Sequence, residues 1–119
     1  MVPYNYYPAE GISDALAVQF DALAKDRYLV GLDQQTFIEQ LAEYWGEINT
    51  IHPFREGNTR SQSVFFSQLA EHAGYIIDID RFTDDQDLRD EFVNARFYDQ
   101  ATGSSSRLAD VLRQAVTPA

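Results

Sequence analysis

One short segment of the sequence concentrates side chains that act on phosphates. Residues 51–61 read Ile-His-Pro-Phe-Arg-Glu-Gly-Asn-Thr-Arg-Ser. The imidazole of His52 is a side chain that can take a proton from a hydroxyl near neutral pH. Glu56 is a hard oxygen ligand of the kind that Mg²⁺ accepts beside substrate phosphates, and Arg60 can fork two hydrogen bonds to an anion. A base, a metal ligand and an arginine this close together predict a site for phosphoryl or nucleotidyl transfer.

The elements around this segment are expected to present it as an anion site. Pro53 stops the preceding helix, because the residue before a proline is pushed out of the helical region, and it holds the loop with His52 rigid. A helix predicted over 58–73 would place Gly57 and Asn58 at its N-terminus, where unpaired N–H groups and the helix dipole attract anions. Gly57 has no Cβ to keep a phosphate from the backbone. Taken by itself, His52 has the alternative of a surface or capping histidine.

Hydrophobic periodicity predicts a chain made almost entirely of helices. The predicted helices run from Ser13, as N-cap, to near Gly31, from 34 to 50, from 58 to 73, from 84 to 99 and from 107 to 116. Residues 1–11 are rich in Tyr and Pro and read as an extended arm or half of a hairpin. The predicted fold class is all-α, with about five helices.

Two finer predictions concern the third helix and the residues that follow it. Val64, Phe65 and Leu69 are expected to face inward, and Gly74 is placed to take the left-handed position that ends the helix. Residues 75–80 read as a short extended run, too isolated to build a sheet.

The composition limits the kinds of protein and partner that fit the chain. It has 119 residues, no cysteine, 45% apolar residues and a formal net charge of −10, which predict one folded domain without disulfides or thiolate metal sites. That charge disfavours nonspecific nucleic-acid binding. The one lysine, Lys25, lies in no glycine-rich loop, so a P-loop is absent. No apolar stretch is long enough to span a membrane, and the N-terminus lacks the features of a signal peptide. The expectation is a soluble, cytoplasmic domain that binds neither nucleic acid nor membrane.

The segment resembles the signature of the Fic family (filamentation induced by cAMP), H-x-F-x-[DE]-G-N-x-R-x-x-R, over 52–63. The matching residues are His52, Phe54, Glu56, Gly57, Asn58 and Arg60. Residues 7–12 are similar to the segment that follows the family's target-registering flap, and 41–44 to the helix leading into the motif. The resemblance implies that 1–119 is a Fic domain, a bundle of about five helices with a flap arm over 1–11. The helices that usually precede the flap are not expected within it.

The resemblance also implies an activity and a role for each matching residue. Fic proteins transfer AMP from ATP to a hydroxyl side chain of a target protein, with Mg²⁺. The implied roles are general base for His52, anchor of the loop in the core for Phe54, Mg²⁺ ligand for Glu56, and ATP or phosphate binding for Gly57, Asn58, Thr59 and Arg60. Tyr4, Tyr6 and Tyr7 have two readings that stay open, a flap that aligns the target segment by strand addition or a hydrophobic arm packed on the domain.

Two departures from the signature leave alternatives open. The second arginine is Ser63 here, so the usual contact to the γ-phosphate is missing, and Thr59 stands where glycine is commonest. The alternatives to AMP transfer are a nucleotide-binding variant with altered, phosphoryl transfer and a catalytically silent protein-interaction module. The family's inhibitory pattern [ST]-x-x-x-E-[GN] does not occur in the chain. Inhibition is therefore expected from a separate antitoxin-like partner, as in toxin–antitoxin systems. The adenine pocket is expected near 94–98.

Overall fold

The computed structural model describes the backbone of residues 12–51 and 56–119, and the side chains of 17–49, 62–82 and 84–119. The elements are α1 (Ile12–Lys25), the 3₁₀ turn η2 (Arg27–Leu29), α2 (Gln34–Ile51), α3 (Glu56–Ala73), β1 (Tyr75–Ile77), α4 (Arg81–Asp84), α5 (Gln86–Thr102), α6 (Ser106–Arg113) and β2 (Val116–Pro118). Within those residues, five helices are eight residues or longer and α4 is a single turn. The prediction of an all-α bundle is confirmed.

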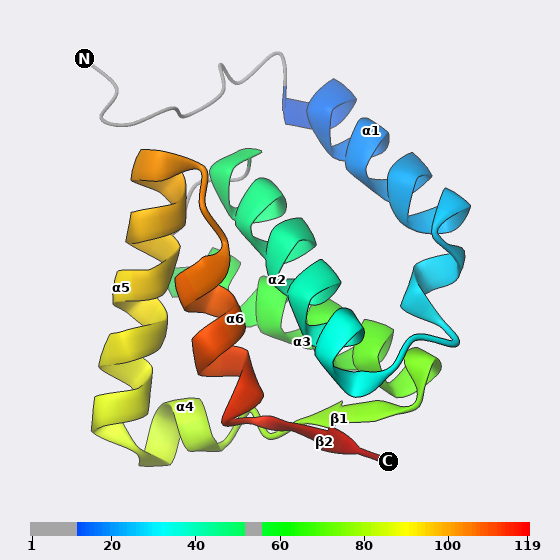
Figure 1. Ribbon diagram of the computed structural model, residues 1–119. Helices are drawn as coiled ribbons and strands as arrows, with labels where there is room; N and C mark the ends of the chain where they lie inside the picture. The colour runs from blue at the N-terminus through cyan, green and yellow to red at the C-terminus, as the bar shows by residue number, and fades with distance from the viewer. Residues whose placement is uncertain (1–11, 52–55) are drawn as a thin grey trace, which may run out of the picture.

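In Figure 1, α2 runs through the middle of the molecule, with α5 and α6 on one side of it and α1 on the other. The strands β1 and β2 lie together at the end of the molecule where α2 begins, and α2 and α5 both end at the opposite end. The last turns of α2 therefore lie beside the last turns of α5, where Gly46 meets Asp99. None of the described helices has the length and apolar character needed to cross a bilayer.

Polar side chains set where several helices start and stop. Asp33 caps α2, because its carboxylate accepts hydrogen bonds from the backbone N–H of Thr36 at 3.2 Å and from the Thr36 hydroxyl at 2.7 Å. These bonds lower the pKa of Asp33. Asp85 caps α5 in the same way by accepting from the N–H of Leu88 at 3.1 Å. Gly74 follows α3 with a φ of 93°, so its predicted left-handed conformation is confirmed.

Two predicted helix boundaries near the N-terminal half were wrong. Ser13 is the second residue of α1 rather than its N-cap, since the helix begins at Ile12. The helix also ends at Lys25 instead of near Gly31, because Arg27 and the two residues after it all have positive φ values, between 53° and 65°. This left-handed turn reverses the chain and buries Leu29 under it.

The C-terminal part contains a small sheet that the sequence did not predict. Ile76 of β1 pairs with Thr117 of β2 in an antiparallel ladder, so the expectation that residues 75–80 stay isolated was wrong. The predicted last helix also ends early, at Arg113 rather than 116, because the following residues form the partner strand. The helix predicted over 84–99 is split at Asp85, whose backbone is extended, and then continues to Thr102.

The core is centred on an aromatic stack that joins three helices. The indole of Trp45 on α2 stacks on Phe66 of α3 with 4.4 Å between ring centroids, and meets Phe92 of α5 edge-on at 5.2 Å. Phe66 is fully buried, whereas Val64 is 53% exposed. The inward face of α3 therefore differs from the predicted one. Leu69 is buried as expected, but Val64 points to solvent.

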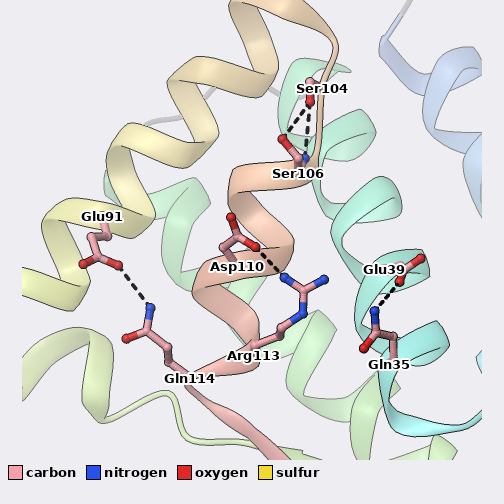
Figure 2. Close-up of polar contacts among 8 residues, drawn as sticks. All are labelled: Gln35, Glu39, Glu91, Ser104, Ser106, Asp110, Arg113 and Gln114. Atoms are coloured by element: carbon pink, nitrogen blue, oxygen red, sulfur yellow. Dashed lines mark hydrogen bonds and ion pairs between the residues drawn. The ribbon is translucent and has the colours of Figure 1, made fainter.

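Exposed polar side chains make contacts along α2, along α6, and between α5 and the residue that follows α6 (Figure 2). The amide of Gln114, just after α6, donates to Glu91 of α5 at 3.1 Å, and Gln35 donates to Glu39 along α2 at 3.0 Å. Arg113 pairs with Asp110 within α6. Exposed contacts of this kind contribute little to stability, so the orientation of the three helices depends mainly on the core.

Candidate active site at the start of α3

The backbone of the candidate site forms the first turn of α3. The helix begins at Glu56, two residues before its predicted start at Asn58, so Gly57 also lies within that turn. The first four N–H groups of a helix have no partner within it, and their dipoles favour a bound anion. The first turn of α3 therefore contains Gly57 and Asn58, and their role as a phosphate cradle stays a prediction.

Most of the predicted side chains lie outside the described part of the chain. This holds for His52 and Phe54 in the segment between α2 and α3, and for Tyr4, Tyr6 and Tyr7 in the N-terminal arm. It also holds for the side chains of Glu56, Asn58, Thr59 and Arg60, of which only the backbone is described. Their roles stay predictions. In the described residues, no group of three or more His, Cys, Asp or Glu side chains could hold a metal ion.

A buried hydrogen bond fixes the second turn of α3 against α2. The indole N–H of Trp45 donates to Oε1 of Gln62 at 3.3 Å, and both side chains are buried. Gln62 comes two residues after Arg60, so this bond and the Trp45–Phe66 stack hold α3 within one turn of the candidate phosphate site. Sequence reasoning missed Gln62. The only signal was a polar residue one turn before Phe66, on the same face of the helix.

Ser63 occupies the place of the second arginine of the signature, in the second turn of α3. The residue is half-buried. A serine side chain is short and uncharged, so it cannot supply the planar, cationic fork that an arginine offers to a phosphate. The cationic side chain predicted to act at this end of α3 is therefore Arg60.

Polar side chains are buried on the last two turns of α2 and of α5. Asn49 on α2 and Arg96, Asp99 and Gln100 on α5 are all buried. The guanidinium carbon of Arg96 lies over the ring of Phe92, 4.4 Å from its centroid, and burial lowers the pKa of Arg96 to about 9. The four side chains are a buried polar set near the C-terminal ends of the two helices. Sequence reasoning did not identify it.

The carboxyl group of Asp99 lies against Gly46 of α2. A Cβ built on Gly46 would overlap both carboxylate oxygens, so glycine is required there for the close approach of α5. Burial, and then the charge of Glu47, raise the pKa of Asp99 to about 6. The carboxyl group of Asp99 therefore ionises at a higher pH than an exposed aspartate does.

The region expected to hold the adenine, 94–98, is partly buried, since Ala95 and Arg96 face the interior. Asn94 is exposed and Phe97 partly so. The ring of Tyr98 is covered by the guanidinium of Arg107 from α6, whose central carbon lies 3.9 Å from the ring centroid. These contacts tie the two helices together. They do not single out an adenine-binding residue.

A separate apolar groove of about 560 Å³ lies between the end of α1 and α3. Its lining includes Phe20, Tyr28, Phe65 and His72. The ring of His72 meets that of Tyr28 edge-on at 6.0 Å. The groove follows the C-terminal half of α3, at the far end of the helix from the candidate phosphate site.

Comparisons with known proteins agree with this architecture. The sequence model of the Fic/DOC family matches residues 4–70. The chain is 55% identical over 53 residues to "Probable protein adenylyltransferase Fic" of Escherichia coli (strain K12), covering 44% of this chain and 26% of that protein. It is 39% identical over 95 residues to "Protein adenylyltransferase VbhT" of Bartonella schoenbuchensis, covering 80% of this chain and 19% of that protein.

The fold is similar to that of a crystal structure of BepC from Bartonella tribocorum with bound AMPPNP. The TM-score is 0.83 at 25% identity, over 100% of this chain and 56% of that one. The chain spans about a quarter or less of the length of the two curated relatives described above. The family match covers more than half of the chain and includes the whole segment from His52 to Ser63. On this evidence the chain belongs to the Fic/DOC family.

Proposed function

We propose that the chain forms the catalytic domain of a protein adenylyltransferase, which transfers AMP from ATP to the hydroxyl of a Tyr, Ser or Thr side chain in a target protein. The observation that carries the proposal is the sequence His52–Arg60 leading into the first turn of α3. Similarity to proteins named as adenylyltransferases, and to a fold crystallised with the ATP analogue AMPPNP, supports it.

The reaction assigns one task to each residue of the segment. His52 takes the proton of the target hydroxyl, whose oxygen attacks the α-phosphorus of ATP. The new oxygen–phosphorus bond forms as the bond between the α-phosphorus and the bridging oxygen to the β-phosphate breaks, and pyrophosphate leaves. Gly57 and Asn58 bind phosphate oxygens through the N-terminus of α3, and Arg60 binds the charge that develops on the leaving group. Phe54 anchors the segment that holds His52.

The first turn of α3 is suited to a magnesium nucleotide. Its unpaired N–H groups favour phosphate oxygens, and Glu56 is the first residue of the same turn. Mg²⁺ bound there would neutralise phosphate charge and orient the triphosphate. Glu56 holds the ion in this proposal, and Thr59 adds a hydroxyl within reach of a phosphate.

A second function is favoured by Ser63. Without the second arginine the γ-phosphate loses its usual charged partner, so the triphosphate can bind in another register, with the γ-phosphoryl group presented to the hydroxyl. Nucleotide binding with phosphoryl transfer is therefore the alternative, and a silent protein-interaction module is the outcome if neither group is transferred. The proposal further includes a separate antitoxin-like inhibitor, a cytoplasmic location, and contact of the target with Tyr4, Tyr6 and Tyr7.

The test is transfer of label from ATP. The purified chain is incubated with Mg²⁺ and a cell lysate, with ATP labelled at the α- or, separately, the γ-phosphate, beside a His52→Ala variant. Label from the α-position alone, lost in the variant, is the expected result and means that Ser63 is tolerated. Label from the γ-position alone establishes the phosphoryl-transfer alternative, and label from neither position contradicts transfer by this chain.

A further inference from the structure

Gln62 is a polar side chain in the buried contact between α2 and α3. It is 4% exposed, and its Oε1 accepts a hydrogen bond from the indole N–H of Trp45 at 3.3 Å. Trp45 is itself fully buried. Burying an amide or an indole N–H costs free energy unless each of them finds a partner. The bond between Trp45 and Gln62 therefore offsets a cost that two apolar side chains in the same contact would not have.

The place of Gln62 along α3 is close to the candidate phosphate site. Among the side chains that the structure describes in this helix, it is the buried one nearest to the first turn. The other buried side chains of α3 lie farther along it: Phe66, Leu69 and Ala70. At about 1.5 Å of rise per residue, the backbone of Asn58 lies about 6 Å along the helix axis from Gln62 and about 12 Å from Phe66.

A hydrogen bond at this place limits movements of α3 that the aromatic core allows. Contacts between apolar surfaces are non-directional, whereas a hydrogen bond weakens steeply when its geometry is lost. If α3 tilted by about 10° around Phe66, the backbone of Asn58 would move by about 2 Å. That displacement is enough to break a hydrogen bond between a first-turn N–H group and a phosphate. The bond to Trp45 opposes the tilt, because Gln62 lies between Phe66 and the first turn.

We propose that Gln62 is a positioning residue for the nucleotide, because its hydrogen bond to Trp45 holds the first turn of α3 in a fixed place relative to α2. The N–H groups of that turn are the ones assigned above to the phosphates. The inference rests on the proposed function for its effect on nucleotide affinity. Gln62 is not a catalytic residue in this account, since its side chain is buried and acts through the backbone of its own helix.

Three single variants and one double variant test the proposal. Gln62→Met removes the acceptor and keeps a side chain of similar length, and Trp45→Phe removes the donor and keeps an aromatic ring in the stack. The matched control is Gln68→Met, because Gln68 is exposed, lies on the same helix and lines the apolar groove near its other end. All measurements are made at a temperature at which thermal unfolding, followed by circular dichroism, shows every variant to be folded.

The first measurement is the Kd of the Mg²⁺ complex of AMPPNP, determined by calorimetry. Gln62→Met and Trp45→Phe should each raise this Kd about threefold to tenfold, since a displaced helix N-terminus loses part of its interaction with an anion. In the double variant the two effects should not add, because both substitutions remove the same bond. Gln68→Met should keep the wild-type Kd. A general loss of stability would not produce this pattern.

The second measurement is hydrogen exchange by NMR, which needs no nucleotide. The backbone N–H groups of Arg60 and Ser61 are the ones that bond to the first carbonyls of an α-helix beginning at residue 56. Their exchange therefore reports local opening of the first turn. Exchange should be about threefold to tenfold faster in Gln62→Met and Trp45→Phe, as for the loss of one hydrogen bond. In Gln68→Met it should be unchanged.

Each measurement has a result that contradicts the proposal. An unchanged Kd for AMPPNP in Gln62→Met, unchanged exchange at Arg60 and Ser61 in that variant, or an equal change in Gln68→Met would overturn the inference. If the wild type does not bind AMPPNP, the proposed function fails, while the exchange rates still decide whether Gln62 holds the first turn of α3.

Discussion

The substitution Asp99→Asn tests whether the α2–α5 interface buries a carboxyl group at a cost in stability, because it removes the charge and changes little else. The side chain is 6% exposed and lies against Gly46 of α2. Burial, and then the charge of Glu47, raise its pKa to about 6. Asp99→Asn keeps the shape of the side chain and removes the possibility of ionisation, so it should make the folded protein more stable near neutral pH.

The magnitude follows from the difference between the folded and unfolded pKa values. An aspartate in an unfolded chain has a pKa of about 3.9, and each unit of difference is worth about 1.4 kcal/mol. A folded pKa of about 6 therefore corresponds to up to about 3 kcal/mol of unfolding free energy.

The direction of the pH dependence is also determined. The folded protein binds the proton more tightly than the unfolded chain, so below about pH 4 both states are protonated and the carboxyl group costs nothing. Between about pH 4 and pH 6 the wild type loses stability progressively, and above about pH 6 it bears the full cost of a buried charge. Asp99→Asn should therefore match the wild type at the acidic end and exceed it by up to about 3 kcal/mol at about pH 7.5.

The assay is urea unfolding of both proteins at several pH values across this window. Asp90→Asn is the control, because Asp90 lies exposed on the same helix and its substitution removes the same unit of charge. Its effect should stay within about 0.5 kcal/mol at every pH, as for other surface changes. If Asp99→Asn is less stable than the wild type at neutral pH, Asp99 is ionised and well paired in the fold. If its advantage is the same at every pH, folding does not change the pKa of Asp99. Either result would show that the burial argument is wrong.

Three further predictions concern the packing that supports the site. Gly46→Ala should lower the unfolding free energy by about 1–3 kcal/mol, because the new Cβ would overlap the Asp99 carboxylate. In a double-mutant cycle measured by thermal unfolding, Asp99→Ala should relieve part of this loss. Strictly additive effects of the two substitutions would count against the contact. Phe66→Ala should cost about 3–5 kcal/mol in urea unfolding, since Phe66 is fully buried; a loss below about 1.5 kcal/mol would mean that the core relaxes around the cavity. Tyr44→Phe should cost about 1–2 kcal/mol, since the hydroxyl of Tyr44 donates to Asp26; an unchanged urea midpoint would contradict a stabilising role for that bond.

Local patterns predicted the long helices well because their signals lie within a few residues. The glycine at 74 is an example, since its conformation depends on the chemistry of one residue at a helix end. The pairing of Ile76 with Thr117 could not be predicted in the same way, because it joins segments about forty residues apart in the sequence. The same holds for the left-handed turn at 27–29, where the burial of Leu29 offsets three unfavourable φ values.

The candidate site also has features that the local sequence predicts and features that depend on long-range packing. The residue types and their spacing from His52 to Arg60 were sufficient to predict phosphate chemistry and to resemble the Fic signature, because the chemistry depends on a contiguous segment. The start of α3 at Glu56 agrees with that prediction to within two residues. The packing around the segment was missed, since Gln62 and Asp99 meet Trp45 and Gly46 only when the helices pack together.

The sequence by itself therefore determined the helical class, the family and the segment predicted to bind a nucleotide, because these depend on short-range periodicity and on side chains adjacent in the chain. The tertiary structure alone decided which polar side chains become buried. Trp45 joins α2, α3 and α5 in one stack, and the approach of α5 at Gly46 encloses Asp99. The physical reason is that the burial of a side chain depends on every surface that surrounds it, and those surfaces come together only in the folded chain. Burial in turn sets the pKa of a carboxyl group and the need of an amide for a hydrogen-bond partner.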